Sequence, residues 1–534
     1  MAKKYGVIVL AGLFICSALF ISGATKKIYT AGSSLYSKIE LFSTILRRIE
    51  NDYVEEKEPS ELIDSAIKGM VSDLDPHTSY LTSEEFSKWN QNFSGYSGIG
   101  ITFDVVQGKI TVMSVIKGGP SEKAGLKPGD RIVKINGVSS IGLKRDEVPL
   151  KLMGPKGTTV DVSIERHHAQ DLIDFTLTRD EVHLESIPYA FMIKPGIGYI
   201  AIVRFSATTG SELKQHLADL SEQGMTSLIL DLRDNGGGYL KAAVDVSETF
   251  LDKGKLIVYT KGRIRRSFRE FKASAGNAFT GLPVTVLINH RSASASEIVS
   301  GALQDWDRAV IIGETSFGKG LVQSQYTFND GSALLMVTAR YYTPSGRLIQ
   351  RPYDNKSKQE YYREPAQNGA PADHTGKPSF NTKILGRTVY GGGGITPDYF
   401  LQADSDTISA PVQKLVLSRD RLLFTFTEQY INTHHQNNMT FYEFLHNYSP
   451  SNAVLDDLFT YINSKGFTIS RKDFTLNSKD ISYFLKQNIA DILWGDEARF
   501  KVQLLRDTWF QESLKYVENS KEILAKSAGI KKAG

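Results

Sequence analysis

The sequence predicts an α/β protein of several domains, in which a helix-covered sheet follows a small β-rich domain. Apolar runs of strand length alternate with amphipathic helical patterns over residues 182–398, and this order is typical of a sheet with helices on its faces. Residues 93–180 hold short strands separated by glycine turns, whereas residues 26–92 and 405–534 follow helical periodicity. We therefore expect helical segments at both ends.

Length and composition exclude several classes of protein. The chain has 534 residues, of which 41% are hydrophobic and 23% charged, as expected for a few globular domains. The net charge is only +4, and no dense basic stripe with interleaved aromatics predicts a nucleic-acid partner. The single cysteine, Cys16, lies in the apolar N-terminal segment. We therefore expect no disulfide, no catalytic thiol and no cysteine-bound metal. No metal or organic cofactor is expected elsewhere in the chain either.

Residues 1–25 have the pattern of a targeting segment. Lys3 and Lys4 precede an uncharged apolar stretch over residues 5–25, which contains the small-residue sequence Ser-Gly-Ala. This pattern is typical of a secretory signal peptide, although the stretch is nearly long enough to remain as a membrane anchor. In both cases the positive flank stays in the cytoplasm and the remainder is exported. We expect a periplasmic or cell-envelope protein, and membrane attachment if the segment is uncleaved.

Residues 26–92 are expected to form a helical arm. Ile39, Phe42 and Ile45 recur at helical spacing. His77 follows a Pro turn, where a capping role is expected rather than a metal site. The arm is suited either to packing within the chain or to pairing two copies, so a homo-oligomer stays open.

Residues 93–180 are expected to form a compact peptide-binding domain. Gly98 and Gly100 precede an exposed strand, and a short helix ending at Gly125 leads to a turn and an Asn-Gly hairpin. A glycine-rich loop beside a strand edge can bind a terminal carboxylate on its N–H groups while the peptide adds as a strand. The alternative is that the glycines only turn a hairpin. The predicted peptide-binding residues are Gly98, Ile99, Gly100 and Ile101.

The elements of the segment 181–404 alternate between strand and helix. In chain order we expect a strand at 198–205, a helix at 209–223, a strand at 227–232 and a helix at 239–250. Strands at 256–259 and 284–288, a helix at 297–304, a strand at 308–313, and a hairpin of 321–328 with 332–342 follow. Two glycine-rich turns, at residues 233–238 and 314–320, follow buried strands. Such turns at strand ends are where chemistry is expected.

A serine-rich turn, residues 289–296, lies between a buried strand and a helix. It places small hydroxyls beside the unpaired N–H groups of a helix start. Acyl transfer needs this combination of a nucleophile and donors for a developing oxyanion. Plain helix capping would use the same residues, so this turn alone leaves both interpretations open.

A serine nucleophile needs a base, and two residues are candidates. His290 lies only four residues before Ser294, so it would have to fold back over the turn, and we expect a structural role for it. Lys319 lies between glycines after another buried strand, which should run parallel to the strand before the serines. A lysine can act as a base only if desolvation lowers its pKa from about 10.4. Phe317 and the apolar hairpin favour such surroundings, and a solvated loop lysine is the alternative.

Three motifs together resemble the carboxy-terminal processing (tail-specific) proteases. They are Asp-Leu-Arg-Asp-Asn-Gly-Gly-Gly, Ser-Ala-Ser-Ala-Ser-Glu and Gly-Glu-Thr-Ser-Phe-Gly-Lys-Gly-Leu-Val-Gln, in the family's order, with 25 positions between Ser294 and Lys319. The resemblance covers about residues 30–400. It includes Ala-Gly-Leu-Lys-Pro-Gly-Asp-Arg-Ile, a sequence similar to that of PDZ domains.

The resemblance implies a crotonase-like β/α protease core with an inserted PDZ domain and a Ser–Lys dyad. Ser294 would be the nucleophile, Lys319 the general base and Gln323 the residue that orients the lysine, on the same side of a strand. Asp305 would be supporting structure. The implied oxyanion hole consists of N–H groups of Ala295 and of Gly236 or Gly237.

We therefore expect a serine endopeptidase that recognises the C-terminal tails of protein substrates through its PDZ domain. The alternatives are a catalytically inactive PDZ adaptor with a protease-like fold, and an enzyme of acyl transfer on small thioesters. The region after residue 405 departs from the family pattern, and no role is predicted for it. The expected domains are 1–25 (signal or anchor), 26–92 (arm), 93–180 (PDZ), 181–404 (protease core) and 405–534 (helical region).

Overall fold

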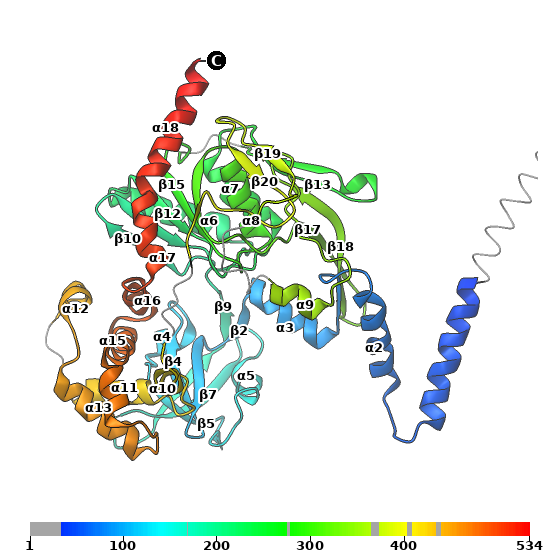
Figure 1. Cartoon of the computed structure of the whole chain (residues 1–534). Coiled ribbons are helices and arrows are strands. Elements are labelled where there is room, and N and C mark those ends of the chain that lie inside the picture. Colours follow the sequence, from blue (N-terminus) through cyan, green and yellow to red (C-terminus); the bar gives the residue numbers. More distant parts are fainter. Residues whose placement is uncertain are drawn as a thin grey trace, which may run out of the picture. The chain divides into compact units, whose positions relative to one another are not determined.

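The computed structural model describes residues 34–533 except 168, 275–277, 365–372, 403–407 and 434–438 (Figure 1). The predicted signal or anchor lies outside the described residues. Two compact units are present: Met1–Ser83 with Gln325–Met336, and Glu84–Ser324 with Val337–Gly534. Among the described helices, none combines the length and apolar character that a membrane span requires.

The first unit contains the part of the predicted helical arm (residues 26–92) that precedes Glu84, and the last helix of that stretch belongs to the second unit. Residues 34–52 are helical, and α2 (Pro59–Ser72) leads to the short strand β1 (Ser79–Leu81), which pairs antiparallel with Ala333–Leu335. Asp75 accepts hydrogen bonds from the backbone N–H groups of His77 and Thr78. These residues therefore shape the turn before β1.

The second unit begins with a small β domain. Its sheet has the order β3-β4-β5-β7-β8, with β6 paired to β5, so β3 is an edge strand. The elements are α3 (Ser83–Ser94), β2 (Tyr96–Gly98), β3 (Ile101–Val106), β4 (Lys109–Val115), α4 (Pro120–Ala124), β5 (Arg131–Ile135), β6 (Val138–Ser139), α5 (Glu147–Leu152), β7 (Thr159–Glu165), β8 (Ile173–Thr178) and β9 (Asp180–Val182). Buried aliphatic side chains from both sheet and helices form its own core.

A six-stranded sheet organises the next part of the chain. The strands are β10 (Tyr189–Lys194), β11 (Ile197–Ala201), β12 (Ser227–Asp231), β15 (Val284–Ile288), β16 (Ala309–Gly313) and β21 (Tyr399–Phe400), in that spatial order. Only the β10–β11 pair is antiparallel. The prediction that the strand before the serines runs parallel to the strand before Lys319 is therefore confirmed.

The two faces of this sheet belong to different cores. On β12, Leu228 and Leu230 contact the core that contains α6 (Thr209–Glu222), α7 (Leu240–Phe250) and α8 (Ala295–Asp305). Ile229 instead joins side chains of α16 (Asp496–Leu504), α17 (Thr508–Ser513) and α18 (Val517–Ala533). Alternate strand residues point to opposite faces, so the C-terminal helices cover the face that α6–α8 leave.

A second sheet lies beside the helices α7 and α8. It contains β13 (Leu256–Lys261), β14 (Arg269–Lys272), β17 (Leu321–Thr327) and β18 (Ala333–Tyr342). The predicted hairpin of the last two strands is confirmed. Smaller elements follow: α9 (Lys358–Arg363), β19 (Ser379–Asn381) and β20 (Thr388–Tyr390).

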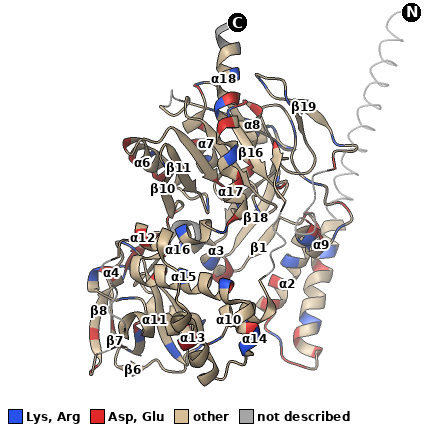
Figure 2. Ribbon diagram, turned by 60° about the vertical axis from the view of Figure 1, so that its left-hand side comes forward, with Lys and Arg blue, Asp and Glu red and all other residues tan. Residues whose placement is uncertain are grey.

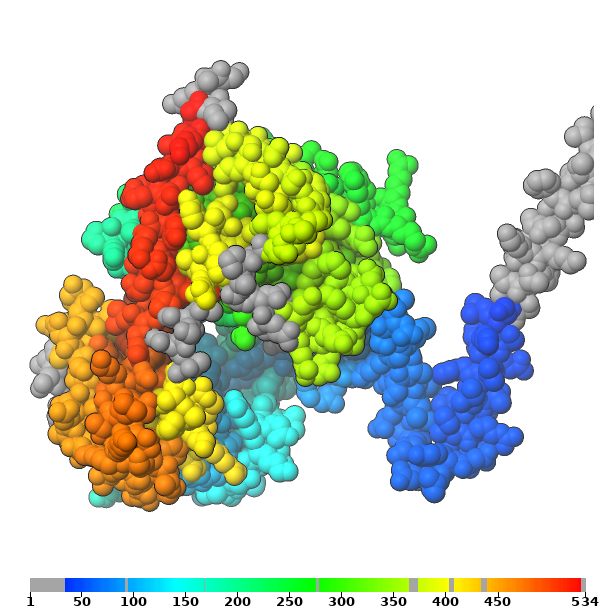
Figure 3. Space-filling model, viewed as in Figure 1, coloured from blue at the N-terminus to red at the C-terminus, as the bar shows by residue number. Residues whose placement is uncertain are grey.

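The six helices described between residues 410 and 494 form a bundle, whose core also takes in Ala498 and Val502 of α16. They are α10 (Ala410–Val416), α11 (Leu422–Thr433), α12 (Phe441–Asn447), α13 (Asn452–Ser464), α14 (Arg471–Leu476) and α15 (Ser478–Trp494), and they enclose their own apolar core. Figure 3 shows this orange bundle against the cyan β domain. Acidic (red) and basic (blue) residues are both spread over the ribbon of Figure 2. The predicted fold class, mixed α/β with a helical C-terminal region, is confirmed.

Candidate active site

The turn between β15 and α8 distinguishes one serine from its two neighbours. Ser292 and Ser296 are fully buried, and their hydroxyls donate to the carbonyl oxygens of Leu232 (2.8 Å) and Asn235 (2.9 Å). Ser294 is half-buried and precedes α8 with φ 55° and ψ −107°. A positive φ is unfavourable for serine and is found mainly where the surrounding structure imposes it. Two serines therefore support the turn, and the third is presented at its surface.

Glu297 connects the serine turn to the lysine loop. Its fully buried carboxylate accepts hydrogen bonds from the N–H groups of Ser294 (2.8 Å), Gly318 (2.7 Å) and Lys319 (2.9 Å), and from the Ser316 hydroxyl (2.5 Å). Burial raises the pKa of Glu297, and these four donors offset part of the rise. In the sequence, Glu297 stands out only as the last residue of the motif Ser-Ala-Ser-Ala-Ser-Glu. A carboxylate three residues into a helix predicts a cap, but nothing local predicts its contacts with a loop about 20 residues away.

The lysine loop packs closely because of its glycines. A Cβ on Gly320 would lie 2.7 Å from the Gln350 backbone nitrogen, and Gly318 has φ 86°. Lys319 is half-buried, and its Nζ lies 2.7 Å from Gln323 Oε1. Lys319 precedes β17, so the expectation that both residues lie on one strand is wrong, although their side chains meet.

Tyr341 joins the same two segments from the adjacent strand, β18. Its hydroxyl lies 2.7 Å from the Lys319 carbonyl oxygen and 3.0 Å from the Ser294 carbonyl oxygen. The side chain is almost fully buried, and this burial raises the pKa of Tyr341. The phenol therefore stays protonated and can donate its one proton between the two carbonyls. No local pattern in the sequence predicts these contacts of Tyr341.

The glycine turn after β12 lies directly against the serine turn. A Cβ on Gly237, which has φ 101°, would lie 2.8 Å from Ser294 Cβ and 3.0 Å from the Ala295 nitrogen. The Gly237 N–H donates to Asn235 Oδ1 (2.8 Å). Ala295 is the first residue of α8, a position whose N–H has no acceptor within the helix. Gly237 and Ala295, two of the three residues predicted for an oxyanion hole, are thus brought together at Ser294, and Gly236 directly precedes Gly237 in the same turn.

The remaining candidates in this region have structural partners. His290 Nδ1 lies 2.7 Å from Glu314 Oε2. Asp305 forms an ion pair with Arg347 at 2.8 Å, and both side chains are fully buried. Burial lowers the pKa of Arg347, and Asp305 counteracts this effect. Both contacts fit the supporting roles expected from the sequence.

The predicted peptide-binding residues lie where β2 leads into the edge strand β3. Gly98 pairs with Asp180 of β9. The carbonyl oxygens of Ile99 and Gly100 accept hydrogen bonds from Ser121 and Ile116. Ile99 and Ile101 are largely buried in the domain core. The apolar side chains therefore build the domain, and only backbone N–H groups would be offered to a terminal carboxylate.

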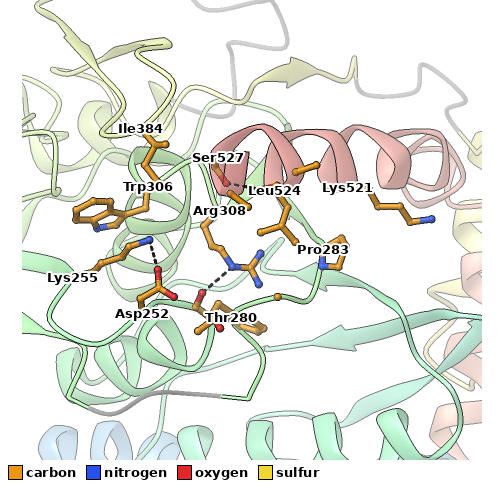
Figure 4. A pocket seen from close by; sticks show the side chains of 14 residues that line it. Asp252, Lys255, Thr280, Pro283, Trp306, Arg308, Ile384, Lys521, Leu524 and Ser527 are labelled. Atoms are coloured by element: carbon orange, nitrogen blue, oxygen red, sulfur yellow. Dashed lines mark hydrogen bonds and ion pairs between the residues drawn. The ribbon is translucent and has the colours of Figure 1, made fainter. Parts of the chain in front are cut away.

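A pocket of about 360 Å³ lies elsewhere, between α18 and the loops next to α7 (Figure 4). Arg308 lies at its centre and donates to the carbonyl oxygens of Phe250 and Leu282. Phe250 is the last residue of α7, so Arg308 caps the C-terminus of this helix. None of the predicted site residues lines this pocket. Over the described residues, no three His, Cys, Asp or Glu side chains are arranged to hold a metal ion.

Comparison with known protein families gives three matches. Residues 196–354 match peptidase family S41, and residues 97–177 match the PDZ domain. Residues 416–495 match a family of unknown function, DUF8443. The first two matches contain the candidate active site and the small β domain, respectively, so the predicted PDZ domain is confirmed.

The chain is also similar to individual proteases. It is 37% identical over 346 residues to the carboxy-terminal-processing protease of Bartonella bacilliformis, covering 64% of this chain and 79% of that protein. It is 35% identical to the carboxy-terminal processing protease CtpA of Bacillus subtilis, covering 65% and 75%. A solved photosystem II D1 C-terminal processing protease is 25% identical, covers 71% of this chain and 97% of that one, and has a TM-score of 0.34. The chain is a serine peptidase of family S41 and belongs to the carboxy-terminal processing proteases.

Proposed function

We propose that the chain is an endopeptidase that cleaves proteins with Ser294 as nucleophile and Lys319 as general base. The observation that carries this proposal is the shared support of the two residues. The Glu297 carboxylate accepts hydrogen bonds from the backbone N–H groups of both Ser294 and Lys319, and Lys319 Nζ donates to Gln323 Oε1 at 2.7 Å. A nucleophile and a base must be fixed in relation to each other, and rigid backbone contacts provide this.

The reaction proceeds through an acyl-enzyme. The neutral Lys319 amine removes the proton of Ser294 Oγ as this oxygen attacks the substrate carbonyl carbon. The resulting oxyanion is stabilised by N–H groups of Ala295 and of the glycine turn. Within that turn the Gly237 N–H already donates to Asn235 Oδ1, which favours the Gly236 N–H as the second donor. Collapse of the intermediate breaks the C–N bond, and the lysine ammonium gives its proton to the leaving amine. Water, deprotonated by the same lysine, then hydrolyses the ester and restores Ser294.

Substrates would be recognised by their C-termini at the PDZ domain. The edge strand β3 offers an open edge of the sheet, to which an extended peptide can add as a further strand. The N–H groups of residues Gly98–Ile101 would bind the terminal carboxylate. The N-terminal sequence supports export to the periplasm or cell envelope, with membrane attachment if the segment is retained.

Replacing Ser294 with alanine tests the proposal. The variant should lose cleavage of an unfolded protein substrate by at least about 10³-fold, because no other hydroxyl can form the acyl-enzyme. Mass spectrometry of the wild type with a slow ester substrate should show the acyl group on Ser294. Cleavage by Ser294→Ala at the wild-type rate would refute the assignment and indicate another nucleophile, whereas a wild-type protein that cleaves no substrate would favour the PDZ adaptor.

A further inference from the structure

The glycine turn next to Ser294 is anchored from the C-terminal region by a charged contact. Arg233 lies two residues after the end of β12 and three residues before Gly236. Its guanidinium donates to both oxygens of Asp507, at distances of 3.0 and 2.7 Å. The two residues are separated by 274 positions along the chain. Paired hydrogen bonds of this kind fix the orientation as well as the position of the arginine.

This arginine is also bound on the side of the sheet. Asp231, the last residue of β12, accepts from Arg233 Nη2 at 2.6 Å. The Arg233 side chain is only 15% exposed, and that of Asp231 7%. Burial lowers the pKa of Arg233, but the two carboxylates together raise it above the ordinary value. The guanidinium is therefore held between one carboxylate from the sheet and one from the C-terminal region.

The segment that carries Asp507 is also linked to β12 through Tyr199 of the neighbouring strand β11. Asp507 caps α17, because its side chain accepts the N–H of Phe510 at 2.9 Å. Phe510 is 2% exposed and packs edge-on against the ring of Tyr199, with ring centroids 5.5 Å apart. The Tyr199 hydroxyl donates to Asp231 at 2.7 Å. The contacts thus form a closed circuit from the strand end through Arg233, Asp507 and α17 back to Asp231.

We propose that Asp507 is a positioning residue for the glycine turn, and that α17 is the part of the C-terminal region on which the active site depends. The inference rests on the proposed function, because the turn matters only if it supports the oxyanion. Asp507 does not touch the reacting atoms. It acts through Arg233, whose backbone leads directly into the turn that packs against Ser294, where a Cβ added to Gly237 would lie 2.8 Å from Ser294 Cβ. A small displacement there would lower the rate of acylation without weakening substrate binding.

Replacing Asp507 with asparagine in the full-length protein tests this role. The variant keeps the size of the side chain and an oxygen that can cap α17, but it removes the charge that holds Arg233. We expect kcat to fall by between about 10- and 100-fold, while KM changes less than about twofold. Asp507→Glu should recover part of the rate, because it restores the carboxylate. The acylation rate with a small ester substrate should fall by the same factor, because the defect lies at the oxyanion site.

Asp480→Asn is the matched control. Asp480 pairs with Arg506 at 2.8 Å in a largely exposed contact, and its loss should leave kcat unchanged. An unchanged kcat in Asp507→Asn, or a change in KM alone, would overturn the positioning role. If Asp507→Asn does not fold, Asp507→Glu is compared with the wild type instead. A glutamate variant with unchanged kcat but reduced stability would indicate that Asp507 has only a structural role. Ser294→Ala in the same assay separates the two proposals. An active Ser294→Ala variant would refute the Ser–Lys dyad. An inactive Ser294→Ala variant together with a fully active Asp507→Asn variant would refute only the role of Asp507.

Discussion

At the scale of single residues, the partner of Lys319 matters because it carries no charge. Gln323 Oε1 accepts one N–H of the lysine at 2.7 Å. An amide oxygen orients the amine, but unlike a carboxylate it does not strongly favour the ammonium form. This arrangement suits a base that has to be neutral before it can accept a proton from serine.

We predict that Gln323→Glu impairs the enzyme in a pH-dependent manner. The new carboxylate would stabilise the ammonium form of Lys319, so the acidic limb of the kcat/KM profile should move to higher pH. The rate at pH 7 should fall by about tenfold, and much of it should return at pH 9. Peptide hydrolysis measured from pH 5 to 10 checks this. A profile that falls equally at every pH would instead indicate loss of packing, and Gln323→Ala provides the comparison for that effect.

Part of the site could be predicted from the sequence because its motifs are local. Each candidate motif is a contiguous segment that follows a buried strand, and the spacing from Lys319 indicates Ser294 among the three serines. The structure supplies an independent reason for that choice, since the hydroxyls of Ser292 and Ser296 are already bonded to backbone carbonyls. The contacts of Tyr341 and Asp507 were not predictable, because they join positions whose proximity depends on the complete fold.

At the scale of elements, Gly236 and Gly237, the first two glycines of the turn after β12, differ in the space around them. A Cβ on Gly237 would lie 2.8 Å from Ser294 Cβ, and φ is 101°. No atom lies within 4 Å of a Cβ built on Gly236. Of these two positions, only Gly237 therefore needs to be glycine for steric reasons.

We predict that Gly237→Ala inactivates the enzyme whereas Gly236→Ala does not. The first change forces the turn away from the serine and requires an unfavourable φ, and it should lower kcat by more than about 100-fold. The second keeps the backbone N–H and meets no neighbour, so its rate should stay within about threefold of the wild type. Circular dichroism should show both variants folded. Equal losses of activity in the two would argue against close packing as the cause.

The core strands were predictable for a physical reason. Strands β12, β15 and β16 are buried on both faces, and strands of this kind read as continuous apolar runs. What covers the second face was not predictable. That layer comes from α16–α18, whose sequences are largely polar and lie beyond the recognisable motifs. Their contacts depend on a few apolar side chains, among them Leu504, Phe510 and Val517.

At the scale of the whole molecule, the helical bundle of the C-terminal region is joined to the PDZ domain by ion pairs. Arg131 of β5 lies 3.0 Å from Glu428 of α11, and Arg421 lies 2.7 Å from Asp104 of the edge strand β3. The Glu428 side chain is only 5% exposed. Burial raises its pKa, and the Arg131 charge opposes this rise. The PDZ domain thus has a defined partner surface formed by the region of unknown function.

We predict that Arg131→Met weakens this interface more than removal of both charges does. The single change leaves a buried carboxylate without its guanidinium and should cost about 3 kcal/mol, whereas Arg131→Met with Glu428→Gln should recover most of that loss. Because the pKa of the unpaired carboxyl would rise further in the folded state, the penalty should be full above that pKa and fade as pH falls toward the unfolded value of about 4.3. Hydrogen exchange of α11 and β5, measured from pH 7 down to pH 5, reports this local opening.

The control is Lys109→Met, since the Lys109–Glu165 pair is partly exposed and should contribute less than about 1 kcal/mol. Equal protection in the single and double variants would show that the ion pair does not hold the PDZ domain to the bundle.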